Sequence, residues 1–250
     1  MKHFFSILAL LSPSIWAADV WEAKPFEDWT AKDLQKIASS SPWARQTRAV
    51  VASTSAAARD RGVIGDVSSN DAPAGRPARG AGNAGGADRL GAAPSDFDPT
   101  GQPAQQPGVP VVVRWQSALP MRQAQMRSKY GKEAATAPDA QKFLAQEPML
   151  YVIVVAGLPG PVASAGGGDQ VKRTAARDST LAAKGKEPLR PLAVEFLPNG
   201  TGVDVLIAFP RSLPFTLEDQ EAEFSAQIGA ASIKYKFKFK DMLVHGKLEL

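Results

Sequence analysis

The sequence predicts an α+β fold: a mostly antiparallel sheet of about six or seven strands, covered by a few short helices. Three segments support this prediction. Residues 111–115 put Val111, Val113 and Trp115 on one strand face, residues 221–228 alternate polar with apolar positions, and residues 149–158 are apolar almost throughout. Helical patterns separate the strand patterns. A β-sandwich is the alternative architecture.

The strand at 149–158 is rich in Val and Ile, which is typical of a central strand covered on both faces. A hairpin follows it, because the turn signal Asn199-Gly200 stands between two apolar runs. The predicted pairs across this turn are Val194 with Val205, Glu195 with Asp204, and Phe196 with Val203.

Two short helices and one long loop complete this domain, which we expect to span 110–250. One helix begins at Pro120, whose fixed φ suits a first helical turn, and a second covers 139–146. Residues 159–188 are rich in Gly, Ala and charged residues. They predict a long mobile loop.

The first residues have the three parts of a signal peptide. Lys2 and His3 precede an apolar run of eight residues, and the small residue Ala17 ends the segment. A helix needs about 20 apolar residues to cross a bilayer, so we expect residues 1–17 to be cleaved rather than kept as an anchor. The sequence therefore predicts export to the periplasm or the medium, with no transmembrane segment after cleavage.

Residues 52–109 predict a disordered linker rich in Ala, Gly and Pro, because so few large apolar residues cannot offset the entropy of ordering. Within it, residues 80–85 (GAGNAG) match a dinucleotide-binding fingerprint, but no strand or helix pattern flanks them. The chain has no cysteine. An exported domain without disulfides has to rely on its hydrophobic core.

Residues 18–51 predict a small helical unit. Thr30 is the expected N-cap and Asp33 completes a capping box, while Pro42 ends the helix. The unit is rich in aromatic residues, namely Trp21, Phe26, Trp29 and Trp43. We expect these side chains to dock on the C-terminal domain, because large apolar clusters are more often buried than exposed. The alternative is an exposed site for a sugar or a peptide.

Lysines alternate with aromatic residues over residues 233–240. The pattern fits a half-buried strand that pairs with 221–228 across a turn at Ala230-Ala231. The predicted pairs are Phe224 with Phe237, Glu223 with Lys238, and Glu221 with Lys240. Lys234 and Lys236 have no acidic partner in this register, which keeps a polyanion-binding strand as the alternative.

Three segments of the chain resemble stretches of a group of uncharacterised proteins exported by soil bacteria. The N-terminal segment contains WEAKPF and SPWA, the middle one reads VVVRWQSALPMRQA, and the last reads KFKFKDMLVHGKLEL. The resemblance covers both ends of the ordered chain and skips the linker. It implies export and one recurring architecture, and it implies no catalytic residue, ligand or partner.

Candidates for catalysis are few. His245 is the one histidine outside the signal peptide, so a Cys/His zinc site is excluded, and its neighbour Gly246 suggests a turn. Glu195 and Asp204, facing each other across the predicted hairpin, are the remaining candidates for a hydrolase. Two carboxylates alone do not make a metal site, and the sequence predicts neither a metal nor a cofactor.

The formal net charge of +4 is modest for 250 residues, and no dense basic patch indicates nucleic-acid binding. We therefore expect an exported binding or structural protein of the cell envelope, without catalytic activity, whose partner is an envelope protein or polymer. A carboxylate-dependent hydrolase and a weak polyanion-binding module are the alternatives.

The signal-peptide prediction can be tested by N-terminal sequencing of the exported protein. Cleavage after Ala17 predicts that the mature chain begins with Ala18. Recovery of a chain that still begins with Met1 would contradict it.

Overall fold

The computed structural model describes residues 19–52, 108–200 and 202–250. Apart from Ala52, these residues belong to one compact unit. The predicted signal peptide lies outside the described residues, and so does nearly all of the predicted linker at 52–109. The linker prediction was two residues too long at its C-terminal end, because strand β3 begins at Gly108.

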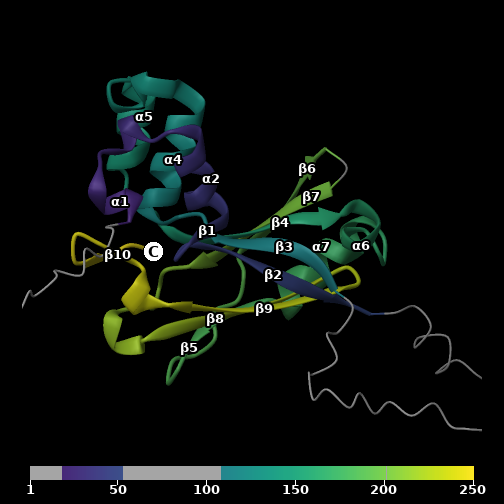
Figure 1. Ribbon diagram of the computed structural model, residues 1–250. Helices are drawn as coiled ribbons and strands as arrows, with labels where there is room; N and C mark the ends of the chain where they lie inside the picture. The colour runs from purple at the N-terminus through teal and green to yellow at the C-terminus, as the bar shows by residue number, and fades with distance from the viewer. Residues whose placement is uncertain (1–18, 53–107, 201) are drawn as a thin grey trace, which may run out of the picture. The chain divides into compact units, whose positions relative to one another are not determined.

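The architecture is an antiparallel sheet with helices, as the α+β prediction states, but it has more strands than the predicted six or seven. Eight strands follow the order β5-β8-β9-β2-β3-β4-β7-β6, and the short β1 pairs with β2 (Figure 1). The long strands are β2 (Ala44–Val51), β3 (Gly108–Trp115), β4 (Leu150–Pro159), β6 (Ala193–Asn199), β7 (Gly202–Pro210), β8 (Glu221–Ile228) and β9 (Ala231–Lys238). The short strands are β1 (Ser40–Ser41), β5 (Thr180–Ala183) and the separate pair β10 (Leu243–Val244) and β11 (Lys247–Leu248).

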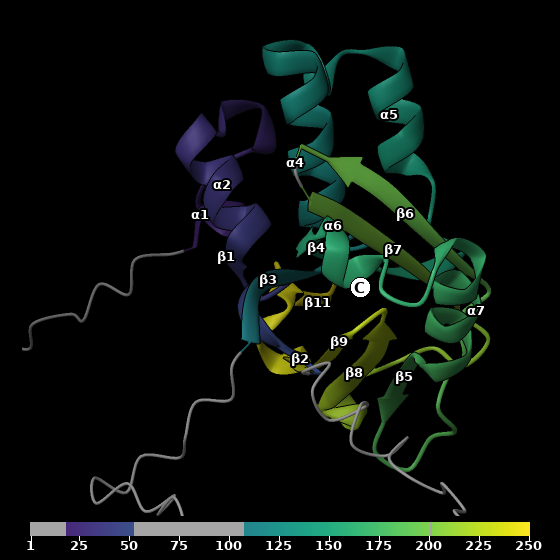
Figure 2. The same ribbon diagram turned by 90° about the vertical axis from the view of Figure 1, so that its right-hand side faces the viewer.

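The helices form two groups. Four of them gather beside one end of the sheet, namely α1 (Val20–Ala23), α2 (Ala31–Ser39), α4 (Leu119–Tyr130) and α5 (Pro138–Ala145) (Figures 1 and 2). The helices that follow β4 are α6 (Gly160–Ala163) and α7 (Gly168–Asp178). Single 3-10 turns are η1 (Phe26–Asp28), η2 (Gly131–Ala135), η3 (Leu217–Asp219) and η4 (Phe239–Asp241).

The prediction of a loop over 159–188 was wrong, because α6, α7 and β5 all lie in that segment. The buried positions there are mostly small or isolated: Ala163 on α6, Val171 and Ala175 on α7, Ser179, and Leu181 and Ala183 on β5. Helix α7 packs on β8 and β6 through this narrow stripe. So few apolar residues give a weak sequence signal even where a helix forms.

Strand β2 was not predicted, and it joins the N-terminal segment to the rest of the fold. It lies in the sheet between β3 and β9, so residues 18–51 are not a separate unit. Half of its sequence, ARQTRAVV, is polar, and its buried residues are Ala44 and Ala49. A strand whose buried positions are alanines shows little hydrophobic alternation.

The predicted helix start, with Thr30 as N-cap and Asp33 in a capping box, is confirmed, but α2 ends at Ser39, before β1, rather than at Pro42. The Thr30 hydroxyl accepts a hydrogen bond from the Asp33 backbone N–H, and the Asp33 carboxylate accepts one from the Thr30 backbone N–H. Lys24 Nζ lies 2.6 Å from Asp33 Oδ2. The Lys24 ammonium and the Thr30 donors hold the pKa of the Asp33 carboxyl far below its usual range.

The core lies on the inner face of the curled sheet and is centred on Trp115. The Trp115 ring packs edge to face against the rings of Phe237 (5.0 Å between ring centroids), Tyr151 (5.4 Å) and Phe239 (6.2 Å). In a second edge-to-face contact, the ring centroids of Phe209 from β7 and Phe224 from β8 are 6.3 Å apart. Because β7 and β8 lie far apart in the strand order, this contact requires the sheet to curl round the core.

Both predicted hairpin registers were wrong by two residues. Phe196 pairs with Val205 rather than Val203, because Asn199 and Gly202 are the last pair before the turn. Glu221 pairs with Lys238 rather than Lys240, because the turn is at Gly229-Ala230, where Gly229 supplies a φ of 57°. A shift of two residues leaves every side chain on its predicted face, so the inner and outer faces were still assigned correctly.

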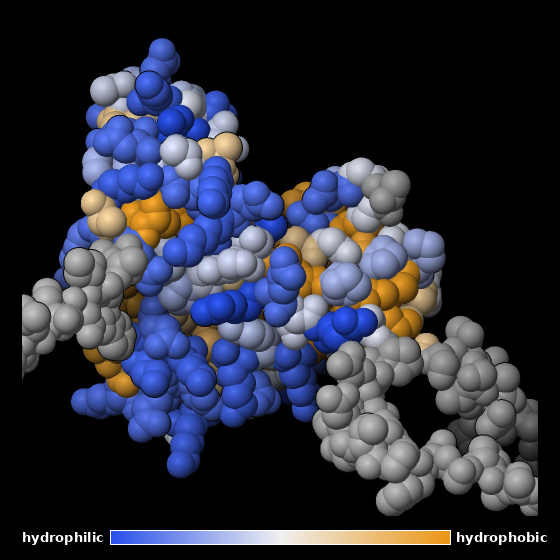
Figure 3. Space-filling view, in the orientation of Figure 1, coloured by the Kyte–Doolittle hydropathy of each residue, from blue (hydrophilic) through white to orange (hydrophobic). Residues whose placement is uncertain are grey.

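The lysine strand β9 is half-buried, as predicted. Ile233 and Phe237 are fully buried. Lys236 does have acidic partners, contrary to the prediction: its Nζ lies 2.6 Å from Glu221 Oε1 and 3.8 Å from Glu223 Oε2. Lys234 is exposed and lies opposite Ser225. The surface over β8 and β9 is largely hydrophilic (Figure 3).

Denaturant melts of two single variants of β9 test this arrangement. Phe237→Ala is expected to lower the free energy of unfolding by ~3–5 kcal/mol, because it opens a cavity beside Trp115. Lys236→Ala is expected to lower it by no more than ~1 kcal/mol, because the ion pairs that it removes are exposed. Comparably small effects at both positions would contradict the burial of this strand.

Candidate functional site

The residues that the sequence singled out for function do not form one site. His245 lies in the turn between β10 and β11 with a φ of 48°, and its side chain is exposed. Trp21, Trp29 and Trp43 are buried in the main core, and Phe26 is half-buried against it. Trp43 Nε1 also donates to the Glu249 carbonyl oxygen at 2.7 Å. These aromatic residues pack as the docking interpretation predicts.

Glu195 and Asp204 are not opposite each other, contrary to the prediction. Glu195 pairs with Leu206, and Asp204 pairs with Leu197, so the two carboxylates lie diagonally on the outer face. Asp204 Oδ1 accepts a hydrogen bond from the Gly157 backbone N–H (3.0 Å), and Oδ2 accepts one from Asn199 Nδ2 (3.2 Å). Asp204 therefore ties β7 to the bulge in β4 and to the hairpin turn.

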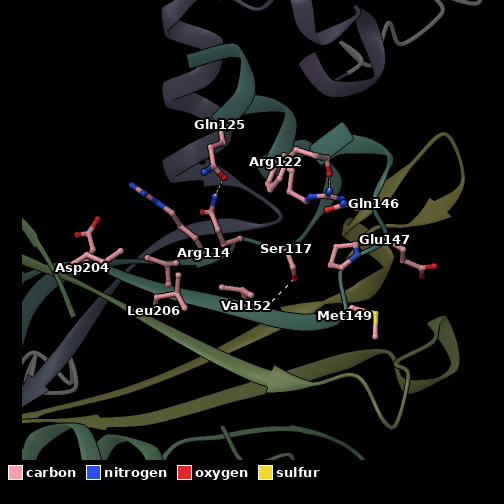
Figure 4. A pocket seen from close by; sticks show the side chains of 15 residues that line it. Arg114, Ser117, Arg122, Gln125, Gln146, Glu147, Met149, Val152, Asp204 and Leu206 are labelled. Carbon is pink, nitrogen blue, oxygen red and sulfur yellow. Dashed lines mark hydrogen bonds between the residues drawn. The ribbon is translucent and has the colours of Figure 1, made fainter. Parts of the chain in front are cut away.

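The structure instead shows an apolar groove on the outer face of the sheet, where β3, β4, β7 and β6 meet the helices α4 and α5 (Figure 4). We call it the outer groove. Its volume is about 570 Å³, within the ~300–1,000 Å³ typical of small-molecule sites. Its lining residues are Arg114, Gln116, Ser117, Arg122, Gln125, Phe143, Gln146, Glu147, Pro148, Met149, Val152, Val154, Leu197, Asp204 and Leu206.

Apolar side chains from three strands line the floor and one edge of the outer groove. Val152 and Val154 of β4 and Leu206 of β7 lie on adjacent strands, and Leu197 of β6 borders them. At the rim, the Met149 side chain is 85% exposed and Leu197 is 47% exposed. The central strand was predicted to be covered on both faces; Val154 and Ala156 on its outer face are indeed buried, but Val152 is only partly covered.

Arg122 brings a buried positive charge to the outer groove. It comes from α4 and is only 7% exposed. Its Nη2 donates to the Phe143 carbonyl oxygen, and its guanidinium lies over the Phe143 ring at 4.7 Å. Among the described residues Arg122 forms no ion pair. The Glu249 carboxylate attracts its guanidinium electrostatically without forming an ion pair with it. Burial lowers the pKa of Arg122, although a guanidinium stays charged at neutral pH.

Arg114 is the second cation of the groove, and it also holds helix α2. Its Nε donates to the Ala38 carbonyl oxygen at 2.8 Å. Burial lowers the pKa of Arg114, an effect that the nearby Asp204 carboxylate opposes. Beside it, Gln116 Nε2 donates to Gln125 Oε1 at 3.3 Å, which links the residue after β3 to α4 at one wall of the groove (Figure 4).

Sequence reasoning missed both arginines. Arg114 follows Val113 and precedes Trp115, so it reads as an ordinary outward residue of an alternating strand. Arg122 belongs to α4, whose buried residues are Pro120, Met121, Arg122, Ala124 and Met126. These residues do not form one apolar stripe along the helix, so the sequence does not mark Arg122 as buried. One usable signal was the nearly unbroken apolar run at 149–158, because the outer-face positions of such a strand need a cover or a ligand.

No protein-family model, curated protein or solved structure matches the chain. In the part of the chain that the structure describes, no three or more His, Cys, Asp or Glu side chains come together as metal ligands. Over those same residues, no helix combines the length and the hydropathy needed to span a bilayer.

Alanine variants at the two carboxylates separate a structural role from a catalytic one. Asp204→Ala is expected to cost ~0.5–1.5 kcal/mol of unfolding free energy for each hydrogen bond removed, and Glu195→Ala is expected to stay within about ±0.5 kcal/mol. Denaturant melts measure both. A hydrolytic activity of the purified protein that either variant abolished without loss of stability would contradict the structural role.

Proposed function

We propose that the protein is an exported, non-catalytic binding protein of the cell envelope and that the outer groove is its binding site. The observation that carries the proposal is the composition of the groove: an accessible apolar floor with a few polar and cationic groups at its walls. Small-molecule sites have this composition, in which apolar contact supplies affinity and a few polar groups orient the ligand. Export rests on the signal-peptide pattern at residues 1–17.

The position of the groove supports the proposal. Its floor belongs to β4 and β7, which lie inside the sheet and carry the core on their other face. Its walls come from α4 and from the segment between α5 and β4. A rigid floor with walls from helices and loops is the usual arrangement of a binding site, because the scaffold holds the contact residues in place.

The two alternative functions receive less support. A hydrolase based on Glu195 and Asp204 would need an acid–base pair in reach of one substrate, but both Asp204 oxygens accept structural hydrogen bonds. A polyanion-binding strand would need unpaired lysines with exposed aromatics, but Lys236 is ion-paired and Phe237 is buried.

Binding of an uncharged apolar fluorophore, N-phenyl-1-naphthylamine, tests the proposal on the mature chain. Fluorescence is expected to rise on binding and to saturate. Leu206→Ser is expected to weaken binding about fivefold, on the order of 1 kcal/mol for loss of a half-exposed leucine contact. Val50→Ser is the matched control, because Val50 is also exposed on a strand but does not line the outer groove.

Absence of binding would contradict the proposal, and so would equal weakening by both variants. Circular dichroism and a thermal melt of each variant show whether it is folded, so that a loss of binding can be assigned to the groove.

A further inference from the structure

We propose that the ligand of the outer groove is an amphiphile with an apolar chain and a single carboxylate, such as a fatty acid, and that its carboxylate binds Arg122. This inference rests on the proposed function, since it names the ligand class of the same site. It is based on the state of the Arg122 guanidinium, on the shape of the apolar floor, and on where the other charges of the groove lie.

Arg122 has unpaired N–H donors, and its guanidinium lies where a positive charge is poorly solvated. One of its five N–H groups has a partner in the described structure, the Phe143 carbonyl oxygen. The residue is only 7% exposed, but its free nitrogens are not among the fully buried unpaired atoms of the described structure, so they stay accessible from the groove. No acidic side chain pairs with the guanidinium among the described residues, and a poorly solvated charge gains from a partner. A carboxylate matches the planar fork of a guanidinium and can accept two parallel hydrogen bonds from it.

The apolar floor fits the chain of such a ligand. Val152 and Leu206 lie on adjacent strands, and Leu197 extends the apolar surface onto β6, the edge strand. Met149 at the rim has a flexible side chain that can close over chains of different lengths. No hydrogen-bonding group of the floor itself requires a polar ligand body.

The remaining charges of the groove favour one negative group rather than several. Asp204 lies on the far side of the groove from Arg122 (Figure 4), so a second anionic group at that end would meet a carboxylate. The Asp204 carboxylate also attracts the Arg114 guanidinium through space, although no ion pair joins the two among the described residues. Glu147 is exposed and its carboxylate points away from Arg122 in Figure 4, so it leaves the guanidinium accessible.

Isothermal titration of the mature chain with decanoate, 1-decanol and decyltrimethylammonium, each below its micelle concentration, tests the ligand class. Decanoate is expected to bind at least tenfold more tightly than the cation and more tightly than the alcohol. Octanoate is expected to bind more weakly than decanoate, on the order of tenfold for two methylenes. Arg122→Met is expected to weaken decanoate binding at least tenfold and decanol binding less than twofold.

A second pair of variants keeps the test decisive if Arg122→Met does not fold. Leu197 is already half-exposed, and Leu197→Gln and Leu197→Glu remove the same apolar contact. Only the glutamate adds a negative charge. At low ionic strength, Leu197→Glu is expected to bind decanoate at least threefold more weakly than Leu197→Gln, and the two are expected to bind decanol equally.

Equal binding of decanoate and decyltrimethylammonium would overturn the inference, as would a decanoate affinity that neither Arg122→Met nor Leu197→Glu reduces. If the uncharged fluorophore still bound the groove in that case, the proposed function would stand and only the ligand class would fail. A peptide with apolar C-terminal residues and a free carboxylate is a further ligand to titrate. Tight binding of that peptide, together with no binding of decanoate, would also overturn the inference and indicate a protein partner instead.

Discussion

The packing of aromatic rings against Trp115 is the interaction on which the rest of the structure depends. Trp115 ends β3, and its ring meets Phe237 from β9 and Tyr151 from β4. These contacts join strands on both sides of β3 and fill the inner face of the curled sheet. Trp115 Nε1 has no hydrogen-bond partner in the described structure, so the Trp115 ring is held by apolar and ring-edge contacts, while the Tyr151 hydroxyl accepts a hydrogen bond from the Phe215 backbone N–H at 2.9 Å.

Because the inner face is filled by this core, the ligand that we propose would contact the outer face. The outer face of β8 and β9 carries Lys and Glu side chains that pair with one another. The outer face of β4 and β7 carries Val152, Val154 and Leu206 instead, and helices α4 and α5 border it without covering it. The same sheet thus presents a hydrophilic surface at one end and an apolar groove at the other.

The fold could be predicted from the sequence where hydrophobic alternation is strong. Val111, Val113 and Trp115 share a face as expected, and the Thr30–Asp33 capping box starts its helix at the expected residue. Prediction failed for β2, whose buried residues are alanines, and in hairpin registers, because sequence alone did not show which residues make each turn. The groove could not be predicted, because it depends on how far α4 and α5 extend over the sheet, which is a property of tertiary packing.

Arg122 shows why the proposed binding site escapes sequence reasoning. Its burial comes from contacts with Phe143, which is distant along the chain and carries no motif that links the two. That Arg122 could bind a ligand can be recognised only from the tertiary structure, in which the apolar floor from β4 and β7 lies beside it. A site of this kind consists of ordinary residues in an uncommon environment.

Hydrogen–deuterium exchange with and without saturating decanoate tests most directly whether the outer groove is the binding site. We predict that the ligand slows exchange in peptides from α4, from the segment between α5 and β4, and from β4 and β7. Exchange in peptides from α1, β8 and β9 is expected to stay unchanged. Protection confined to α1 and α2, or to β8 and β9, would contradict the account and would place binding at the N-terminal aromatic residues or at the lysine strand.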